Sequence, residues 1–256
     1  MNHTQAFGEI SDTYNRARPS YPDAAVEQII AAITNSPARS LTVADVGAGT
    51  GIFTRLLRDR LPASIKIVGV EPGNDMSRAA QQHTTEGITY INAVAESLPF
   101  ETDALRAVTV AQAIQWFDRP AFLKEAARCL GDLGVLIILQ NNRDWRASPF
   151  LGAYETLLEQ YSPGYNRNYR SFDIKAEVTN SKLFKSVNVL VYPWIRHMPM
   201  ELFRDMSLSS TKMKSAVAIH GIEHMVAAVD ALIAQYFPAD DLTVTYNTEV
   251  YTFQSA

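Results

Sequence analysis

The chain has 256 residues, of which 47% are hydrophobic and 20% are charged, and these proportions are those of an ordinary folded protein. The formal net charge of −4 gives no electrostatic basis for binding nucleic acid. The single cysteine, Cys129, excludes an intramolecular disulfide and a cysteine-rich metal site. No apolar run is long enough to span a bilayer, and the N-terminus is polar. We therefore expect a cytoplasmic protein without a membrane segment or a metal.

The first part of the chain alternates strand and helix patterns. After a helical pattern at 24–33, apolar runs typical of buried strands recur at 41–46, 65–70, 88–92, 107–111 and 135–139. Helical patterns lie between them at 52–60, 75–83 and 119–130. Because helical crossovers imply parallel pairing, the sequence predicts an α/β fold with a Rossmann-like, doubly wound sheet. Such sheets bind their ligands at the carboxyl ends of the strands.

After about residue 141 the pattern changes to helices and two long strands. Helical patterns occur at 150–161, 201–208 and 222–236, and strand patterns occur at 187–197 and 243–253. We expect the late strands to form an antiparallel edge of a mostly parallel sheet, and the helices to form an inserted cover. This organisation predicts one domain over 1–256, with an entry segment at 1–40, a core at 41–140, and the cover with the final strands at 141–256.

A glycine-rich turn follows the first predicted strand. It contains Gly47, Ala48, Gly49, Thr50 and Gly51, and Asp45 precedes it. Glycine permits positive φ and close approach of a ligand, and the N-terminus of the next helix offers free N–H groups. The last glycine comes one residue too early for a dinucleotide fingerprint, and no lysine follows as in a phosphate loop. The turn resembles motif I of the class I S-adenosylmethionine (SAM) methyltransferases; the alternative is a tight turn without a ligand.

Further polar segments follow the next two predicted strands. Glu71, followed by Pro72, could accept hydrogen bonds from both ribose hydroxyls, or it could be a solvated carboxylate. Met76, in the next helical segment, belongs to the same predicted set. Ala95, Glu96 and Ser97 follow the third strand, where a carboxylate can accept from the exocyclic amine of adenine.

The fourth strand ends where a methyl donor and acceptor would meet. Its final segment contains Ala111, Gln112, Ala113, Ile114, Gln115, Trp116 and Phe117. An aromatic face is favourable for a sulfonium, so Trp116 is a candidate for both cofactor contact and catalysis. The alternative is that Trp116 and Phe117 are core residues under a helix.

In this order, the segments resemble the small-molecule class I methyltransferases related to trans-aconitate methyltransferase, over about residues 11–140. The resemblance extends to the N-terminal segment, and it implies that Tyr14 and Arg18 lie near the amino acid end of SAM. It also implies that Asp45 helps to hold the glycine turn and that end of SAM. Many relatives carry histidine where this chain has Gln115, and an amide cannot act as a general base.

His197, at the end of a late predicted strand, is the remaining candidate base, with a surface histidine as the alternative. His220, Glu223 and His224 formally fit an H-x-x-E-H zinc-protease signature. We expect His220 and His224 to open a helix as a polar face instead.

We therefore expect an enzyme that transfers a methyl group from SAM to a small molecule with a carboxylate or hydroxyl acceptor, leaving S-adenosylhomocysteine. Catalytic candidates are His197, Trp116 and Gln115. Two alternatives stay open. One is a SAM-binding protein without transfer activity, and the other is a SAM fold recruited for non-methyl chemistry such as cyclisation.

Overall fold

The computed structural model describes residues 20–239 and 241–256, and they form two compact units. The sheet unit comprises Tyr21–Asn141, Asp173–Tyr192 and Thr248–Ala256. The helical unit comprises Ser20 and the described parts of Asn142–Phe172 and Pro193–Asn247. That both units act as one methyltransferase domain stays a proposal.

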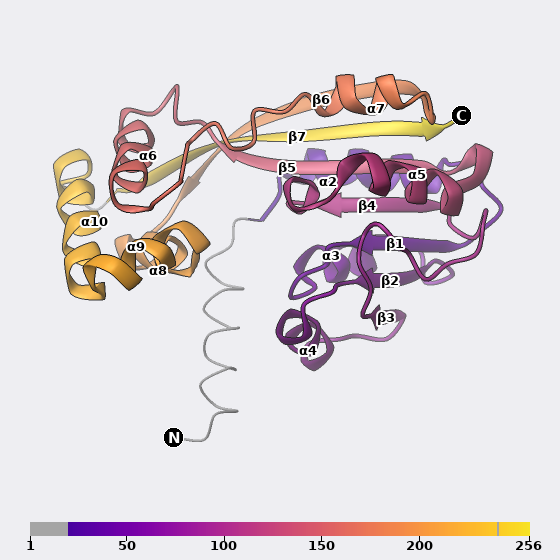
Figure 1. Cartoon of the computed structure of the whole chain (residues 1–256), viewed down its shortest axis with the longest axis horizontal. Coiled ribbons are helices and arrows are strands. Elements are labelled where there is room, and N and C mark those ends of the chain that lie inside the picture. Colours follow the sequence, from indigo (N-terminus) through magenta and orange to yellow (C-terminus); the bar gives the residue numbers. More distant parts are fainter. Residues whose placement is uncertain (1–19, 240) are drawn as a thin grey trace. The chain divides into compact units, whose positions relative to one another are not determined.

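The sheet has seven strands in the order β3-β2-β1-β4-β5-β7-β6. Their bounds are β1 Thr42–Val46, β2 Lys66–Val70, β3 Ile88–Ile91, β4 Ala107–Ala111, β5 Val135–Arg143, β6 Phe184–His197 and β7 Thr243–Ser255. β1 pairs in parallel with β2 and β4, and the pairs β2–β3 and β4–β5 are also parallel. In Figure 1 the arrow of β7 runs opposite to those of β5 and β6. The predicted fold class, with its antiparallel edge, is therefore confirmed.

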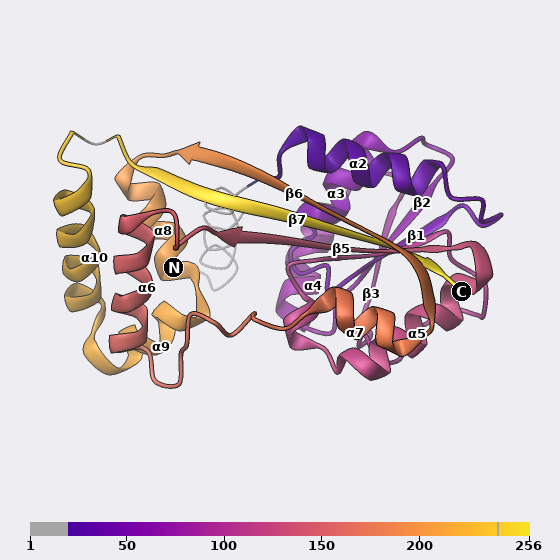
Figure 2. The same cartoon turned by 90° about the horizontal axis from the view of Figure 1, so that it is seen from above.

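Helices cover both faces of the sheet unit, as Figure 2 shows. The helices of this unit are α2 Asp23–Thr34, α3 Ile52–Arg60, α4 Asn74–Gln82, α5 Arg119–Leu130 and α7 Ile174–Ser181, and two 3₁₀ turns, η1 Ile114–Trp116 and η2 Gly131–Leu133, complete it. Alternate side chains of β5 divide the core between the two faces. Val135, Ile137 and Leu139 pack with α2 and α3, whereas Ile138 meets α5 and α7.

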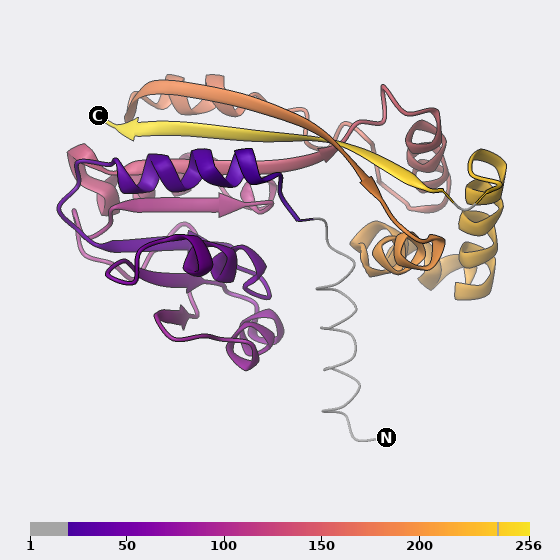
Figure 3. The same cartoon turned by 180° about the vertical axis from the view of Figure 1, so that it is seen from behind.

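The helical unit contains α6 Pro149–Tyr161, α8 Met200–Ser209, α9 Thr211–His220 and α10 Ile222–Tyr236; Figure 3 shows them from behind. Its core is a cluster of aromatic and methionine side chains, with Phe150 between Phe203 and Phe237 at ring distances of 5.0 Å each. Within the described part of the chain, no helix is long and apolar enough to cross a membrane.

Most predicted elements are present within a few residues of the expected bounds, but the structure corrects three points. α7 and α9 were not expected, and β5 continues to Arg143 through polar residues. His220 is the last residue of α9 rather than an opening residue. Gly221, with a φ of 85°, ends α9 and stands before α10, so His220 and His224 lie on different helices.

Candidate functional site

The glycine turn between β1 and α3 is held against β2. Gly47, Gly49 and Gly51 all have positive φ, at 73°, 57° and 77°. The N–H groups of Gly47 and Ala48 donate to the carbonyl of Val70, at 2.8 and 3.0 Å. This left-handed backbone strongly favours glycine at all three positions.

The three glycines face three different surroundings. A Cβ on Gly47 would lie 2.5 Å from Ala113 Cβ and 3.2 Å from Phe117 Cζ. A Cβ on Gly51 would overlap the ring of Tyr90, with Cζ at 2.9 Å. A Cβ on Gly49 would meet no atom of the described residues within 4 Å. Gly49 is therefore the glycine of this turn whose open side could receive a ligand.

Asp45 lies in the middle of the sheet rather than at its edge, because it pairs with Gly69 of β2 and Thr109 of β4. Its carboxylate is buried and accepts hydrogen bonds from the hydroxyls of Thr54, at 2.6 Å, and Thr109, at 3.0 Å. Burial raises the pKa of Asp45 to about 6. Asp45 thus joins β1 to α3, the helix that follows the turn, and to β4.

Glu71 connects the glycine turn to the start of α4. One carboxylate oxygen accepts from the N–H of Gly49 at 2.9 Å, and the other accepts from the N–H of Gly73 at 2.8 Å. Pro72 and Met76 are exposed beside it, and Met76 is 41% exposed although it is a large apolar side chain. A carboxylate next to the open side of Gly49 is suited to accept hydrogen bonds from hydroxyl groups.

The segment after β3 is tied to the segment after β4. Ala95 is buried and Ser97 is exposed. Glu96 accepts a hydrogen bond from the N–H of Asp118 at 2.8 Å, and Asp118 caps α5 by accepting from Ala121 N at 3.2 Å. These contacts bring the ends of β3 and β4 together.

The segment after β4 forms a tight turn around Gln112, whose φ is 61°. The amide of Gln115 donates to the carbonyl of Gln112 at 2.7 Å, so Gln115 stabilises the turn itself. Thr50, on the glycine turn, is buried, and Ala111 and Ala113 are at least partly buried. Trp116 is 66% exposed, so the core interpretation is wrong for this residue. Phe117 is partly buried and its ring lies 5.0 Å from that of Phe122.

Three of the predicted residues lie outside the described part of the sheet unit. Tyr14 and Arg18 lie outside the described residues. His197 is an exposed residue at the end of β6, in the helical unit. Over residues 20–239 and 241–256, no group of three His, Cys, Asp or Glu side chains could hold a metal ion.

Tyr90 and Arg55 were missed by sequence reasoning. Tyr90 pairs with Gly69, and its ring occupies the space that the missing side chains of Gly69 and Gly51 leave. Arg55 donates to the carbonyl of Thr50 at 2.8 Å and so closes the glycine turn from the side of α3. The available signal was Gly69 itself, because a glycine inside a strand indicates close approach of another group.

The chain is similar in sequence to known methyltransferases. Residues 44–138 match the methyltransferase domain family Methyltransf_11. An uncharacterized methyltransferase of Mycobacterium tuberculosis is 33% identical over 141 residues, which are 55% of this chain and 54% of that protein. A putative methyltransferase of Dictyostelium discoideum is 32% identical over 162 residues, 60% of this chain and 59% of that protein. The chain thus spans little more than half the length of the curated relatives it matches.

Solved structures share the fold. A putative type II methyltransferase from Anaeromyxobacter dehalogenans superimposes with a TM-score of 0.69 at 21% identity, over 93% of this chain and 97% of that chain. Phosphoethanolamine N-methyltransferase 2 of Haemonchus contortus, solved with S-adenosyl-L-methionine, gives 0.56 at 15% identity, over 96% and 56%.

The strand order and the glycine turn are those of a Rossmann-like methyltransferase fold. Residues 44–138 are a methyltransferase domain by this family match, and the named relatives are methyltransferases over a similar part of the chain. For these residues the predicted methyltransferase family is confirmed, and S-adenosyl-L-methionine, the predicted cofactor, is bound in a solved structure of the same fold. The specific relation to trans-aconitate methyltransferase stays a prediction.

Proposed function

We propose that this protein transfers the methyl group of SAM to a small-molecule acceptor and releases S-adenosylhomocysteine. The observation that supports this most is the pairing of an open Gly49 with the carboxylate of Glu71, which accepts from the Gly49 N–H at 2.9 Å. A nucleoside whose amino acid part lies on bare backbone, and whose ribose meets a carboxylate, fits such a turn.

The proposed SAM contacts come from the carboxyl ends of four neighbouring strands. Ala48, Gly49 and Thr50 would lie along the methionine part, and Glu71 with Pro72 and Met76 would meet the ribose. Ala95, Glu96 and Ser97 would border the adenine, and Ala111 to Ala113 would close the site below the sulfonium. Phe117 lies beside the Gly47 position and Tyr90 lies beside the Gly51 position, while Thr54 donates to Asp45. These contacts support the proposed SAM site.

Methyl transfer is an in-line displacement at carbon by the acceptor, with neutral S-adenosylhomocysteine leaving. The sulfonium is already an activated leaving group, so the protein has to align donor and nucleophile and exclude water. The exposed ring of Trp116 could stabilise the sulfonium. The Gln115 amide cannot remove a proton, which favours an acceptor that is already ionised, such as a carboxylate. A hydroxyl acceptor would need a base, for which His197 stays the proposed residue.

The decisive experiment measures S-adenosylhomocysteine formation from SAM with a panel of small carboxylic acids and phenols. Gly49→Val fills the open side of the turn, and we expect it to lower the affinity for SAM by more than about a hundredfold, roughly 3 kcal/mol. Gly164→Val is the matched control, because Gly164 also has positive φ and no atom of the described residues within 4 Å of its Cβ position, but it lies in the helical unit.

We expect the wild type and Gly164→Val to bind SAM in calorimetry and to methylate the same panel member. Binding without turnover of any panel member would favour the alternative of a SAM-binding protein. A SAM-derived product other than a methylated acceptor would favour non-methyl chemistry. Equal SAM affinity in the wild type and Gly49→Val would contradict the assigned site.

A further inference from the structure

α7 belongs to the sheet unit, although the chain reaches it through the helical unit. The chain leaves the sheet unit after Asn141 and returns at Asp173, which caps α7 by accepting from Ala176 N at 2.8 Å. α7 lies beside α5 on one face of the sheet (Figure 2). A helix of eight residues is not stable by itself, so its contacts with α5 and the sheet must hold it in place.

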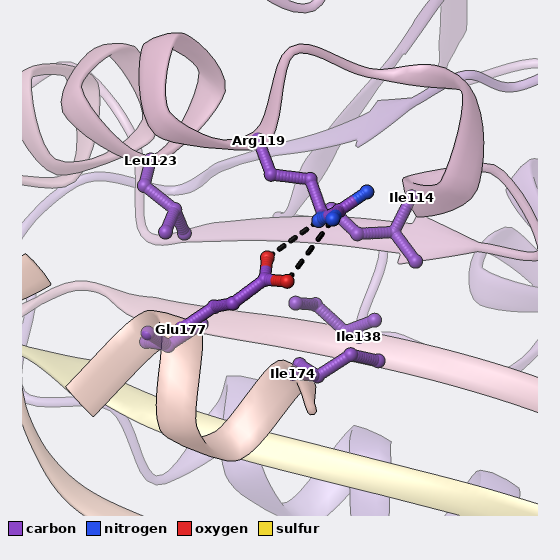
Figure 4. A pocket seen from close by; sticks show the side chains of 7 residues that line it. Ile114, Arg119, Leu123, Ile138, Ile174 and Glu177 are labelled. Carbon is purple, nitrogen blue, oxygen red and sulfur yellow. Dashed lines mark hydrogen bonds and ion pairs between the residues drawn. The ribbon is translucent and has the colours of Figure 1, made fainter. Parts of the chain in front are cut away.

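The main polar contact of α7 is an ion pair with the first residue of α5. Glu177 accepts from Arg119 Nε at 2.5 Å and from the terminal Nη2 at 3.0 Å, so the contact is bidentate (Figure 4). The two side chains are 28% and 35% exposed. A cation in the first turn of a helix is unfavourable for the helix dipole. The carboxylate of Glu177 offsets this cost, and its bidentate geometry links α7 to the first residue of α5.

Apolar side chains of α7 and of the turn before α5 line the same small cavity. Ile114, in η1, is buried and lines a cavity of about 10 Å³ together with Ile138, Ile174 and Val178. Figure 4 shows Ile114 and Arg119 on the same side of this cavity, facing α7. Such a cavity holds one water at most, so it is a packing gap and not a ligand site.

Ile114 and Arg119, the two residues that face α7, lie on either side of Trp116 in the sequence. The segment between Ile114 and Arg119 carries Gln115, Trp116 and Phe117, and Phe117 lies against the Gly47 position. A shift of α7 would therefore move both the exposed Trp116 ring and the side chain that supports the glycine turn. Glu177 is thus connected to Gly47 by its ion pair with Arg119, by the chain from Arg119 back to Phe117, and by the Phe117 ring beside the Gly47 position.

We propose that Glu177 is a positioning residue that acts through Arg119 to fix the Trp116 turn at the acceptor side of the SAM site. The catalytic relevance of this position rests on the proposed function, whereas the link between Glu177 and Trp116 does not. Glu177 itself contacts neither SAM nor the acceptor in this proposal.

The test uses the full chain labelled with 5-fluorotryptophan and observed by ¹⁹F NMR. The sequence has three tryptophans, and Trp116→Phe assigns the resonance of Trp116. In Glu177→Gln we expect that resonance to shift or broaden while those of Trp145 and Trp194, in the helical unit, stay unchanged. We also expect the Kd for S-adenosylhomocysteine to rise about two- to fivefold, the range for loss of a partly exposed ion pair.

A charge swap separates positioning from a general loss of stability. Arg119→Glu alone should displace the Trp116 resonance, and the double variant Arg119→Glu/Glu177→Arg should return it toward its wild-type position. Asp230→Asn is the matched control, because it breaks the Arg204–Asp230 pair, whose side chains are 29% and 38% exposed, in the helical unit. We expect no change at Trp116 in this control.

An unchanged Trp116 resonance in Glu177→Gln would overturn the proposal, and so would an equal displacement in Asp230→Asn. If Glu177→Gln does not fold, Arg119→Lys gives the same test, because it keeps the charge and loses the bidentate geometry. If the wild type binds no S-adenosylhomocysteine, the proposed function fails, and the ligand-free ¹⁹F spectra still decide the link to Trp116.

Discussion

The two units bury carboxylates in opposite ways. In the sheet unit, Asp45 is 1% exposed and is surrounded by the neutral hydroxyls of Thr54 and Thr109. In the helical unit, Glu155 is 3% exposed and accepts from Arg143 at 2.8 Å and from the hydroxyl of Tyr165 at 2.5 Å. Among the described residues, Asp45 therefore loses hydration without gaining a cation, whereas Glu155 is compensated by Arg143.

This difference follows the boundary between the part of the chain that matches the methyltransferase family and the part that does not. The family match covers 44–138, all of it within the sheet unit. In the sheet unit, the proposed SAM site is formed mainly by the backbone of the glycine turn and by residues at the ends of strands. The helical unit lies outside that match and is organised by charged and aromatic side chains. Burial together with the charge of Glu155 raises the pKa of Tyr165, so its hydroxyl remains a donor.

The largest effect is expected for Glu155→Gln, which leaves the partly buried Arg143, with 25% of its side chain exposed, without the carboxylate of Glu155. We expect the free energy of unfolding to fall by about 3–5 kcal/mol, measured by urea denaturation. Glu159→Gln is the control in the same unit, because the Glu159 side chain is 30% exposed in its pair with Arg167. That control should cost no more than about 1 kcal/mol. Equal losses would mean that burial does not distinguish the two pairs.

Asp45→Asn should raise the free energy of unfolding at neutral pH, whereas Glu155→Gln should lower it. The pKa of Asp45 in the folded protein is about 6, above its ordinary value of 3.8, so the folded state binds the proton more tightly than the unfolded state. Wild-type stability therefore falls as pH rises from about 4 to about 6, by up to about 3 kcal/mol, and the Asn variant avoids this loss.

Denaturation at several pH values tests the predicted change in the stability of Asp45→Asn relative to the wild type. The stability of Asp45→Asn relative to the wild type should rise between pH 4 and pH 6 and stay constant above it. A constant difference across this range for Asp45→Asn would show that the folded protein does not shift this carboxyl group.

Glu71→Ala should weaken binding of S-adenosylhomocysteine by about 1–3 kcal/mol, because hydrogen bonds to a charged group are lost. Calorimetry measures this as a rise in Kd of about five- to 150-fold. Glu86→Ala, at an exposed residue of the same unit, should leave the Kd unchanged. If both variants bind alike, Glu71 serves only to hold Gly49 and Gly73.

The parallel sheet and its glycine turn could be predicted from the sequence because each depends on local features. Apolar runs such as 107–111 define buried strands, and glycine spacing defines the turn. β5 was predicted to end at Leu139, because periodicity gives no reason to continue a strand through Gln140 and Asn141. Asn141 is nevertheless stabilised by Thr248, whose hydroxyl donates to it at 2.9 Å across 107 positions of sequence.

The site residues also divide into those that local sequence features reveal and those that depend on contacts with distant parts of the chain. Glu71 was found because its position at a strand end is a sequence property. Glu177 was not found, since α7 is short and polar and acquires its role from an arginine 58 positions earlier. Tyr90 was missed for a similar reason: its ring crosses Gly69, and strand register cannot be read from one sequence.

The three glycines of the turn also determine how this sequence can diverge. A change at Gly51 would need a compensating change at Tyr90, and a change at Gly47 would need one at Ala113 or Phe117. Gly49 has no such neighbour among the described residues, so no change at a packing neighbour there would compensate for its substitution. Among related sequences, positions 51 and 47 should therefore covary with their packing neighbours, while position 49 should be constrained by its positive φ and by the ligand.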